Sequence, residues 1–183
     1  MDFAVVFKFL VETLRREKID FALIGGFALQ AEGVTRTTRD IDLLILSEYS
    51  EKIKSIMLKQ GYDLIHESED VLNFIGKKTE LGRVDFLLAH RKYTLSMLKR
   101  AEAKEVFGGK FKIKVLRPED LIGLKVQASS NDPQRMTQDM ADIEMLMRVN
   151  YATFDKELLK EYFDLFDRGK DLESILRRIE HVE

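Results

Sequence analysis

Two glycines, Gly25 and Gly26, are the first residues in this chain whose type and position could do chemistry. They follow the apolar run 21–24, whose aromatic and β-branched content predicts a short buried strand. A helix of one or two turns is expected to follow over residues 27–32. Such a junction offers free backbone N–H groups and the positive end of a helix dipole, and glycine lets a ligand approach the backbone closely. The pattern predicts a turn that binds phosphate.

Two aspartates, Asp40 and Asp42, open a second predicted strand downstream of the glycines. Because side chains alternate along a strand, both aspartates should lie on one face, and Ile41, Leu43 and Ile45 should point into the core. Two carboxylates on one face at a strand end form a site of hard oxygen ligands. We therefore expect this strand end to hold Mg²⁺ or Mn²⁺.

Together the glycine pair and the aspartates resemble the signature of the nucleotidyltransferase superfamily, which has a polymerase beta-like fold. That signature is Gly-Gly or Gly-Ser, followed about a dozen residues later by Asp-apolar-Asp. The resemblance is closest to the minimal prokaryotic branch that includes the abortive-infection type toxins. Those proteins often carry an Arg-x-Thr-x-Asp-x-Asp run, present here as Arg36, Thr38, Asp40 and Asp42. In this chain Gly26 stands where serine is common. The alternative is a glycine turn with aspartates that only cap a strand end.

The resemblance spans about residues 21–146 and implies a fold of class α/β (α+β). We expect a mixed sheet flanked by helices, with a nucleotidyltransferase core over residues 1–116. A C-terminal helical lobe over residues 117–183 is expected to pack on that core as one compact unit. The tail after Tyr151 carries no recognisable motif.

A third carboxylate, Asp85, lies inside the apolar predicted strand 83–88. A carboxylate in such a strand needs a partner, because burying it alone costs several kcal/mol (~3 or more). In the superfamily a neighbouring strand supplies a third carboxylate to the metals, so the resemblance implies that role for Asp85. The alternative is a salt bridge from Asp85 to Arg83 or Arg39 at a sheet edge.

Two further charged residues are expected on C-terminal helices. Lys125 follows Leu121 and Ile122 at helical spacing, so its amine must either reach outward to solvent or face an anion. Asp139 and Asp142 share a helix face. The toxin-like branch has a lysine and an aspartate in matching contexts, which implies functional roles for Lys125 and Asp139, with Asp142 ranked lower. The alternatives are a surface lysine and an i, i+4 pair between Asp139 and Arg135.

The resemblance assigns the residues of the site as follows. The implied catalytic residues are Asp40, Asp42, Asp85, Lys125 and Asp139. The three aspartates Asp40, Asp42 and Asp85 would bind the metal. The implied nucleotide-binding residues are Gly25, Gly26, Arg36, Thr38, Arg39 and Lys125.

Composition narrows the class of protein. The hydrophobic fraction of 45% and charged fraction of 34% describe a soluble globular chain, and a net charge of −2 gives no general footprint for nucleic acid. No apolar stretch reaches the ~18 residues of a membrane span. No basic segment opens the N-terminus, so we expect no signal peptide and a cytoplasmic protein. Disulfides are excluded because cysteine is absent, and His66, His90 and His181 are too scattered for a zinc site.

The remaining pattern predicts the other elements. Helices are expected over 2–18, 49–60, 92–101, 118–128, 133–149, 155–167 and 170–181, and strands over 62–65, 71–75, 103–107 and 110–116. Residues 129–132 are expected to form a loop before a helix that begins at the Asp132-Pro133 pair. The strand, crossover and strand around the glycines have the order of a βαβ unit.

The first functional hypothesis is a metal-dependent enzyme that moves a nucleoside monophosphate from an NTP to an acceptor hydroxyl. The acceptor stays open between RNA or tRNA, a protein and a small molecule. The enzyme could be the toxin of a toxin–antitoxin pair, with an antitoxin protein as its partner. The second hypothesis is a non-catalytic protein of the same fold that binds a nucleotide or a partner.

Overall fold

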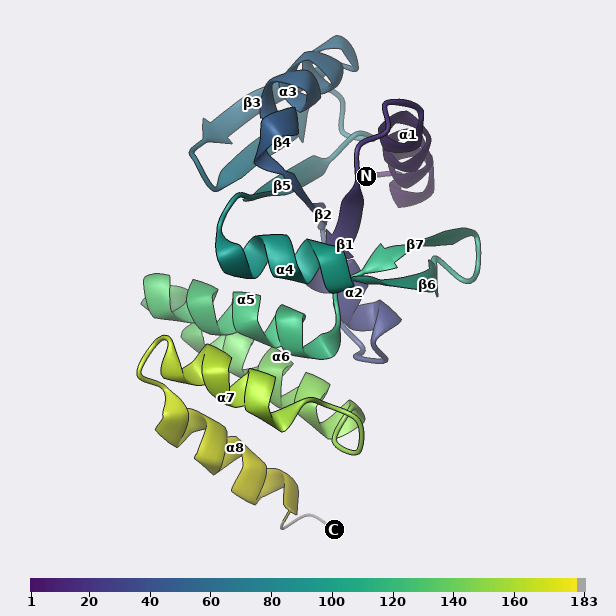
Figure 1. Cartoon of the computed structure of the whole chain (residues 1–183). Helices are drawn as coiled ribbons and strands as arrows, with labels where there is room; N and C mark the ends of the chain where they lie inside the picture. The colour runs from purple at the N-terminus through teal and green to yellow at the C-terminus, as the bar shows by residue number, and fades with distance from the viewer. Residues whose placement is uncertain (181–183) are drawn as a thin grey trace. The chain divides into compact units, whose positions relative to one another are not determined.

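The structure, a computed structural model, describes residues 1–180 and divides into two compact units (Figure 1). The core unit comprises residues 1–31 and 36–116, and the helical unit comprises residues 32–35 and the chain from Arg117 onward. His181, the last residue of the helix expected over 170–181, lies outside the described residues.

The core unit is built on a seven-stranded mixed sheet of order β3-β4-β5-β2-β1-β7-β6. Its strands are β1 (Phe21–Ile24), β2 (Asp40–Leu46), β3 (Tyr62–Glu67), β4 (Val71–Gly76), β5 (Arg83–Ala89), β6 (Glu102–Val106) and β7 (Phe111–Val115). Its helices are α1 (Phe3–Arg16), α2 (Gly25–Ala31), α3 (Ser50–Lys59) and α4 (Lys92–Arg100), with a short 3₁₀ turn η1 (Ser47–Tyr49) before α3. The expected mixed sheet flanked by helices is confirmed.

Strand β2 lies in the middle of this sheet and carries the first two aspartates. Ile41, Leu43 and Ile45 are buried, as the alternation predicted, and Leu44 is buried as well. Both faces of β2 are therefore covered beyond Asp42, and helices α2 and α4 contact the strand. The carboxylates of β2 are thus confined to its first residues, where the strand enters the sheet.

The direction of the first two strands differs from a βαβ unit. Strand β1 pairs antiparallel with β2, with Ile24 opposite Asp42, whereas β2 and β5 are parallel. In a βαβ unit the crossover helix returns the chain to start a parallel strand. Here α2 is only seven residues long, and the chain after it turns back along β1. As a result, the end of β1 and the start of β2 meet at one edge of the sheet.

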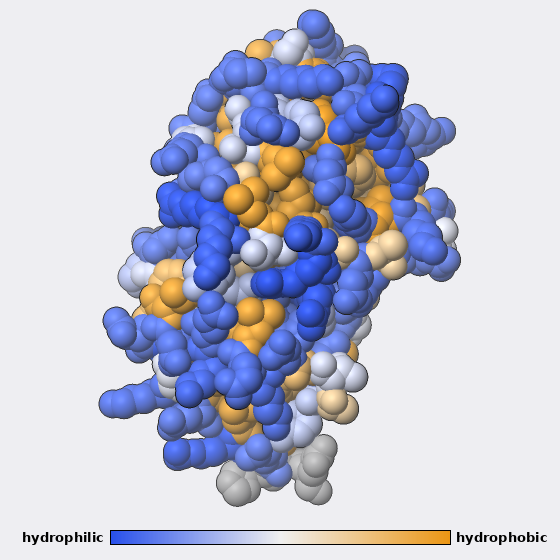
Figure 2. Space-filling model, in the orientation of Figure 1, coloured by the Kyte–Doolittle hydropathy of each residue, from blue (hydrophilic) through white to orange (hydrophobic). Residues whose placement is uncertain are grey.

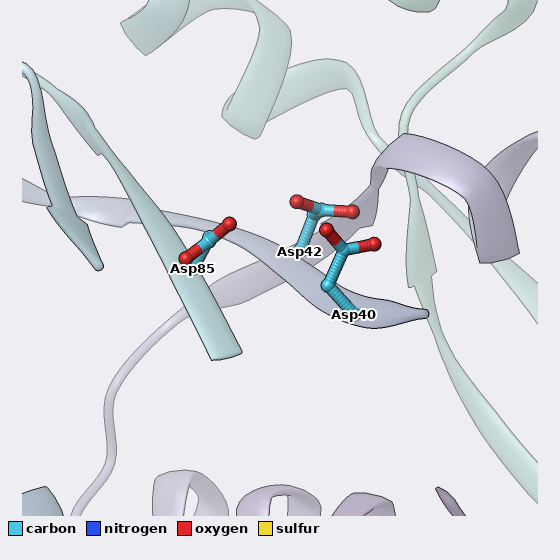
Figure 3. A group of neighbouring side chains, drawn as sticks. All are labelled: Asp40, Asp42 and Asp85. Atoms are coloured by element: carbon cyan, nitrogen blue, oxygen red, sulfur yellow. The ribbon is translucent and has the colours of Figure 1, made fainter. Parts of the chain in front are cut away.

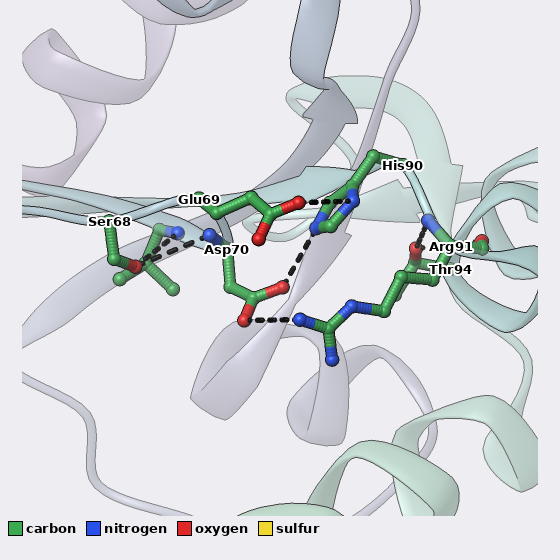
Figure 4. A network of polar contacts seen from close by, with 7 residues as sticks. Ser68, Glu69, Asp70, His90, Arg91 and Thr94 are labelled. Carbon is green, nitrogen blue, oxygen red and sulfur yellow. Dashed lines mark hydrogen bonds and ion pairs between the residues drawn. The ribbon is translucent and has the colours of Figure 1, made fainter.

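A polar network ties together the opposite end of β4 and β5 (Figure 4). Asp70 accepts hydrogen bonds from Arg91 Nη2 at 3.1 Å and pairs with His90 Nε2 at 2.8 Å. His90 Nδ1 lies 3.5 Å from Glu69 Oε1, and the Ser68 hydroxyl accepts from the Asp70 amide at 3.2 Å. These contacts join the β3–β4 turn to the start of α4.

The helical unit contains four α-helices and one 3₁₀ turn within the described residues. They are α5 (Pro118–Asn131), η2 (Pro133–Arg135), α6 (Met136–Val149), α7 (Lys156–Asp164) and α8 (Gly169–Glu180). Pro118 occupies the first turn of α5, and Asp132 caps η2 through its bond from the Gln134 amide.

The loop expected over residues 129–132 is wrong, because α5 continues to Asn131. The Ser129 and Ser130 hydroxyls donate back to the Val126 carbonyl at 3.1 and 2.7 Å, which satisfies their polar groups inside the helix. The helix expected from the Asp132-Pro133 pair begins instead with the η2 turn and becomes α-helical at Met136. Local composition favoured a turn, whereas residues 129–131 are helical and Ser129 is buried.

Hydrophilic side chains cover most of the face seen in Figure 2, with separate apolar patches between them. Across residues 1–180, no helix is both long and apolar enough to cross a membrane.

Candidate active site

Asp40, Asp42 and Asp85 converge in the core unit (Figure 3). Asp42 and Asp85 are register partners on the parallel strands β2 and β5, and Asp40 lies two residues before Asp42 on the same face. One carboxylate oxygen from each residue lies within 4.8 Å of the others, and all three side chains are half-buried. The predicted convergence of these residues is confirmed. Crowding three carboxylates raises their mutual repulsion, so the arrangement needs a compensating positive charge.

The three carboxylates fit a divalent cation. They supply hard oxygen ligands, which Mg²⁺ and Mn²⁺ prefer, and their partial exposure leaves a route from solvent. Within the described residues, this is the one group of three or more acidic, histidine or cysteine side chains with ligand atoms this close together.

Gly25 is required where β1 hands over to α2. Its φ is +65°, in the left-handed region that glycine adopts without steric cost. A Cβ at this position would overlap the carboxylate of Asp42. The backbone of the glycine turn therefore lies directly against Asp42 of β2, so the predicted phosphate turn and metal site adjoin each other.

Gly26 is required for a different reason, because its neighbour is Thr38. A Cβ at Gly26 would lie 2.5 Å from Thr38 Cβ and 2.7 Å from Thr38 Oγ1. The Thr38 hydroxyl in turn donates to Asp40 Oδ1 at 2.9 Å. Threonine thus fills the space that a side chain at position 26 would need, and its hydroxyl orients the Asp40 carboxylate.

Arg83 supplies a positive charge beside the three carboxylates. Its Nε donates to both oxygens of Asp85, at 3.0 and 2.9 Å. This bond raises the pKa of Arg83, with further contributions from the charges of Asp85, Asp40 and Asp42 against an opposing effect of burial. The salt bridge weighed as the alternative for Asp85 therefore exists, and it exists together with the convergence of the triad.

The two arginines of the segment before β2 differ in burial. Arg36 is half-buried, and its carbonyl accepts a hydrogen bond from Gln30 Nε2 at 2.6 Å. Arg39 is exposed beside the start of β2. Both belong to the core unit, and their predicted contact with nucleotide stays a prediction.

Lys125 and Asp139 come together in the helical unit. Lys125 Nζ lies 2.8 Å from Asp139 Oδ1 and 2.6 Å from Asp142 Oδ2, so α5 and α6 share a buried ion-pair group. Arg135 Nε also bonds Asp139 Oδ2, at 3.1 Å. Lys125 is only 12% exposed and does not reach out to solvent. Lys125 and the three aspartates belong to different units, and the expectation that they face one cleft stays a prediction.

Sequence reasoning ranked Asp142 below Asp139 and did not see the link from Thr38 to Asp40. Asp142 is as deeply buried as Asp139 and makes the shorter contact to Lys125. The signal for Asp142 was present, because residues three apart share a helix face. The alternation of residues 38 and 40 offered a weaker signal, since Thr38 precedes the strand.

A mixed sheet with a glycine turn against an aspartate pair, and a third aspartate on the adjacent strand, defines a nucleotidyltransferase. The chain matches the family described as "Nucleotidyl transferase of unknown function (DUF2204)" over residues 6–181, and it belongs to that family. The enzyme class expected from the sequence is confirmed. A comparison with curated proteins finds no match.

Several solved structures share this fold. The antibiotic-resistance factor ANT(2'')-Ia has a TM-score of 0.64 and 15% identity, with 100% of each chain covered. The lincosamide antibiotic adenylyltransferase LnuA, bound to lincomycin, has a TM-score of 0.54 and 15% identity over 79% of this chain and 96% of its own. An antigenic nucleotidyltransferase-like protein from Paracoccidioides brasiliensis has a TM-score of 0.58 and 16% identity, covering 96% of this chain and 92% of its own. At these identities the likeness establishes the fold.

Proposed function

We propose that this nucleotidyltransferase moves a nucleoside monophosphate from an NTP to an acceptor hydroxyl and depends on a divalent cation held by Asp40, Asp42 and Asp85. The observation that carries the proposal is the approach of three carboxylate oxygens to within 4.8 Å of one another. A scaffold gains nothing from such crowding, because like charges held together oppose folding. A divalent cation turns the same crowding into a binding site.

In this proposal the acceptor oxygen forms a bond to the α-phosphorus, the bond to the bridging oxygen breaks, pyrophosphate leaves and the hydroxyl proton is released. Asp40, Asp42 and Asp85 would hold a divalent cation, which would lower the pKa of the acceptor hydroxyl and offset charge on the pyrophosphate. Backbone N–H groups of the turn at Gly25 and Gly26 hold phosphate oxygens, and Thr38 fixes the angle of the Asp40 carboxylate.

Four further side chains extend the proposal toward the substrate. Arg36 and Arg39 add phosphate contacts from the segment before β2. Lys125 neutralises triphosphate charge, and Asp139 orients the acceptor or the nucleotide, as the resemblance implies. Lys125 already pairs with Asp139 and Asp142, so this role requires that its ammonium also interact with the triphosphate.

The acceptor stays open between RNA or tRNA, a protein and a small molecule. Small molecules gain support from two neighbours of the same fold, since one is named a lincosamide adenylyltransferase and another was solved with adenylyl-2''-tobramycin. A toxin role with an antitoxin partner follows only from the resemblance of the Arg-x-Thr-x-Asp-x-Asp run. The non-catalytic alternative is favoured by one observation, the Arg83 bond that already neutralises Asp85.

Transfer of label from NTP tests this proposal. The protein is incubated with Mg²⁺ and each NTP labelled on the α-phosphate, with total RNA, cell protein, tobramycin or lincomycin as acceptor. We expect one acceptor class to gain label, and we expect none to gain label from NTP labelled on the γ-phosphate, because pyrophosphate leaves.

The matched controls are removal of metal with EDTA and the variant Asp42→Asn, which keeps the shape of the side chain. Both should abolish transfer. Transfer that persists in Asp42→Asn would contradict the proposed metal site, and the absence of transfer to any acceptor class in an extract of the source cells would favour the non-catalytic alternative.

A further inference from the structure

Four charged side chains form a square on one face of β2 and β5. Arg83 is the register partner of Asp40, and Asp85 is the register partner of Asp42. Because residues two apart on a strand point the same way, all four side chains lie on the same face. Three corners of the square are carboxylates and the fourth is a guanidinium. The protein therefore builds one positive charge into the site that the proposed function assigns to the cation.

The guanidinium engages the oxygens that a cation would use. Its Nε donates to both oxygens of Asp85, at 3.0 and 2.9 Å, so each oxygen already accepts a hydrogen bond from Arg83. A divalent ion at the triad would draw on the same two oxygens and would repel the positive charge beside it. The cation and Arg83 would therefore compete for the negative charge of Asp85.

Burial shows which of the two groups can give way. The side chain of Arg83 is 45% exposed, whereas that of Asp85 is 17% exposed. Arg83 begins β5, so its side chain can turn toward solvent without opening the core. Asp85 lies further inside the strand and opposite Asp42, where it is held in the position that the triad requires.

We propose that Arg83 is a resident counter-ion that competes with the divalent cation for Asp85, so that loading the site releases the guanidinium from that carboxylate. The proposal rests on the proposed function because it takes the three aspartates as metal ligands. Arg83 stabilises the site without metal and weakens its affinity for the bare ion. It is a positioning residue for Asp85, and its effect is on metal affinity.

Titration with Mn²⁺ alone, followed by the magnetic resonance signal of the free ion, tests the competition without any catalytic readout. Arg83→Met removes the charge and keeps much of the aliphatic stem. We expect it to bind Mn²⁺ about tenfold more tightly than the wild type, the change expected when a unit charge no longer opposes a divalent ion at side-chain distance in an accessible site. The melting temperature without metal should fall, because three carboxylates then lack their counter-ion.

Arg91→Met is the matched control. Arg91 is also an arginine paired with an aspartate, at 3.1 Å from Asp70, and it lies beyond the other end of β5 (Figure 4). The substitution changes the net charge by the same amount as Arg83→Met. Because Arg91 lies away from the triad, its loss should leave Mn²⁺ affinity near the wild-type value. An equal gain in both variants would overturn the proposal, because it would reflect net charge alone.

Arg83→Lys carries the test if Arg83→Met does not fold. Lysine keeps the charge but places it on a flexible stem as a strongly hydrated ammonium, which should hold Asp85 less firmly than Arg83 Nε does, so Mn²⁺ affinity should rise about two- to threefold. Unchanged or weaker affinity in the Arg83 variants, with wild-type binding that depends on Asp42, overturns the counter-ion and leaves the proposed function standing. Failure of the wild type to bind Mn²⁺ overturns both.

Discussion

At the scale of single residues, the glycine pair is explained by what each glycine touches. Gly25 has a positive φ, and the Asp42 carboxylate occupies the space that a Cβ there would need. At Gly26, Thr38 occupies that space. Position 26 often holds serine in the resembled superfamily, and here the hydroxyl beside that position comes from Thr38. Thr38 therefore connects the turn to the carboxylate of Asp40, through its hydrogen bond of 2.9 Å.

The contact between Gly26 and Thr38 predicts a strong coupling between the two positions. Gly26→Ala should destabilise the protein by about 1–3 kcal/mol, the usual cost of forcing extra volume into a packed site. In a Thr38→Gly background the added methyl group has room, so the cost of Gly26→Ala should fall by about 1 kcal/mol or more. Urea unfolding of the four proteins in this cycle measures the coupling.

An additive cycle would contradict the packing described for this pair. Gly25→Ala serves as a comparison, because its cost comes from the positive φ and from the Asp42 carboxylate and should not depend on Thr38. Its free energy of unfolding should be equally lowered in both backgrounds.

At the scale of elements, the parallel register of β2 and β5 brings the site together. It places Asp42 opposite Asp85 and Asp40 opposite Arg83. The start of β2 is thus both the point where the glycine turn arrives and the point where the third carboxylate is supplied. At the opposite end of β4 and β5, Asp70 pairs with His90 and Arg91 and joins the β3–β4 turn to the residues that follow β5.

The ion-pair group between α5 and α6 predicts the behaviour of Lys125. Asp139 and Asp142 are 3% and 2% exposed, so removing their lysine leaves two buried carboxylates poorly compensated. Lys125→Met should lower the free energy of unfolding by about 3–5 kcal/mol. The triple variant Lys125→Met with Asp139→Asn and Asp142→Asn should recover most of that loss, since no buried charge is then left without its partner.

Chemical denaturation of the two variants measures this difference. A loss below about 1 kcal/mol for Lys125→Met would contradict a stabilising role for this ion-pair group and would favour a role of Lys125 in substrate binding. Arg148→Met is a suitable reference, because Arg148 pairs with Glu144 on α6 in a more exposed setting and should cost much less.

The sequence was sufficient for those features that depend on local periodicity. Alternation along a strand predicted that Asp40 and Asp42 share a face, and an isolated carboxylate in an apolar strand pointed to Asp85. Pairing direction could not be predicted in the same way, because the antiparallel contact of β1 and β2 depends on where the chain turns after α2. The extension of α5 through Ser129 and Ser130 depends on hydroxyl bonds that composition alone does not reveal.

The same limit applied within the site. The space around Gly26 is set by Thr38, and no local pattern relates a glycine in a turn to a threonine beyond the next loop. Periodicity allowed either Asp139 or Asp142 to meet Lys125, and packing brought both to it. From the sequence, a metal-ligand role for Asp85 and a salt bridge to Arg83 are alternatives, whereas the structure places Asp85 both beside Asp42 and in contact with Arg83.

At the scale of the whole molecule, the crowded aspartates are proposed to bind a divalent cation together with its nucleotide. A cation relieves the repulsion among the carboxylates, and a triphosphate adds further ligands to it. Binding to the folded state alone must then raise the melting temperature.

The most direct test is the melting temperature of the wild type and of Asp42→Asn, each alone, with NTP and Mg²⁺, and with NTP and EDTA. We expect the wild type to be stabilised by NTP with Mg²⁺ and much less by NTP with EDTA. Asp42→Asn should lose the metal-dependent part and, without ligand, should melt at or above the wild-type temperature, because one crowded charge is gone. An Asp42→Asn protein that melts lower without ligand and responds to nucleotide as the wild type does would contradict the account.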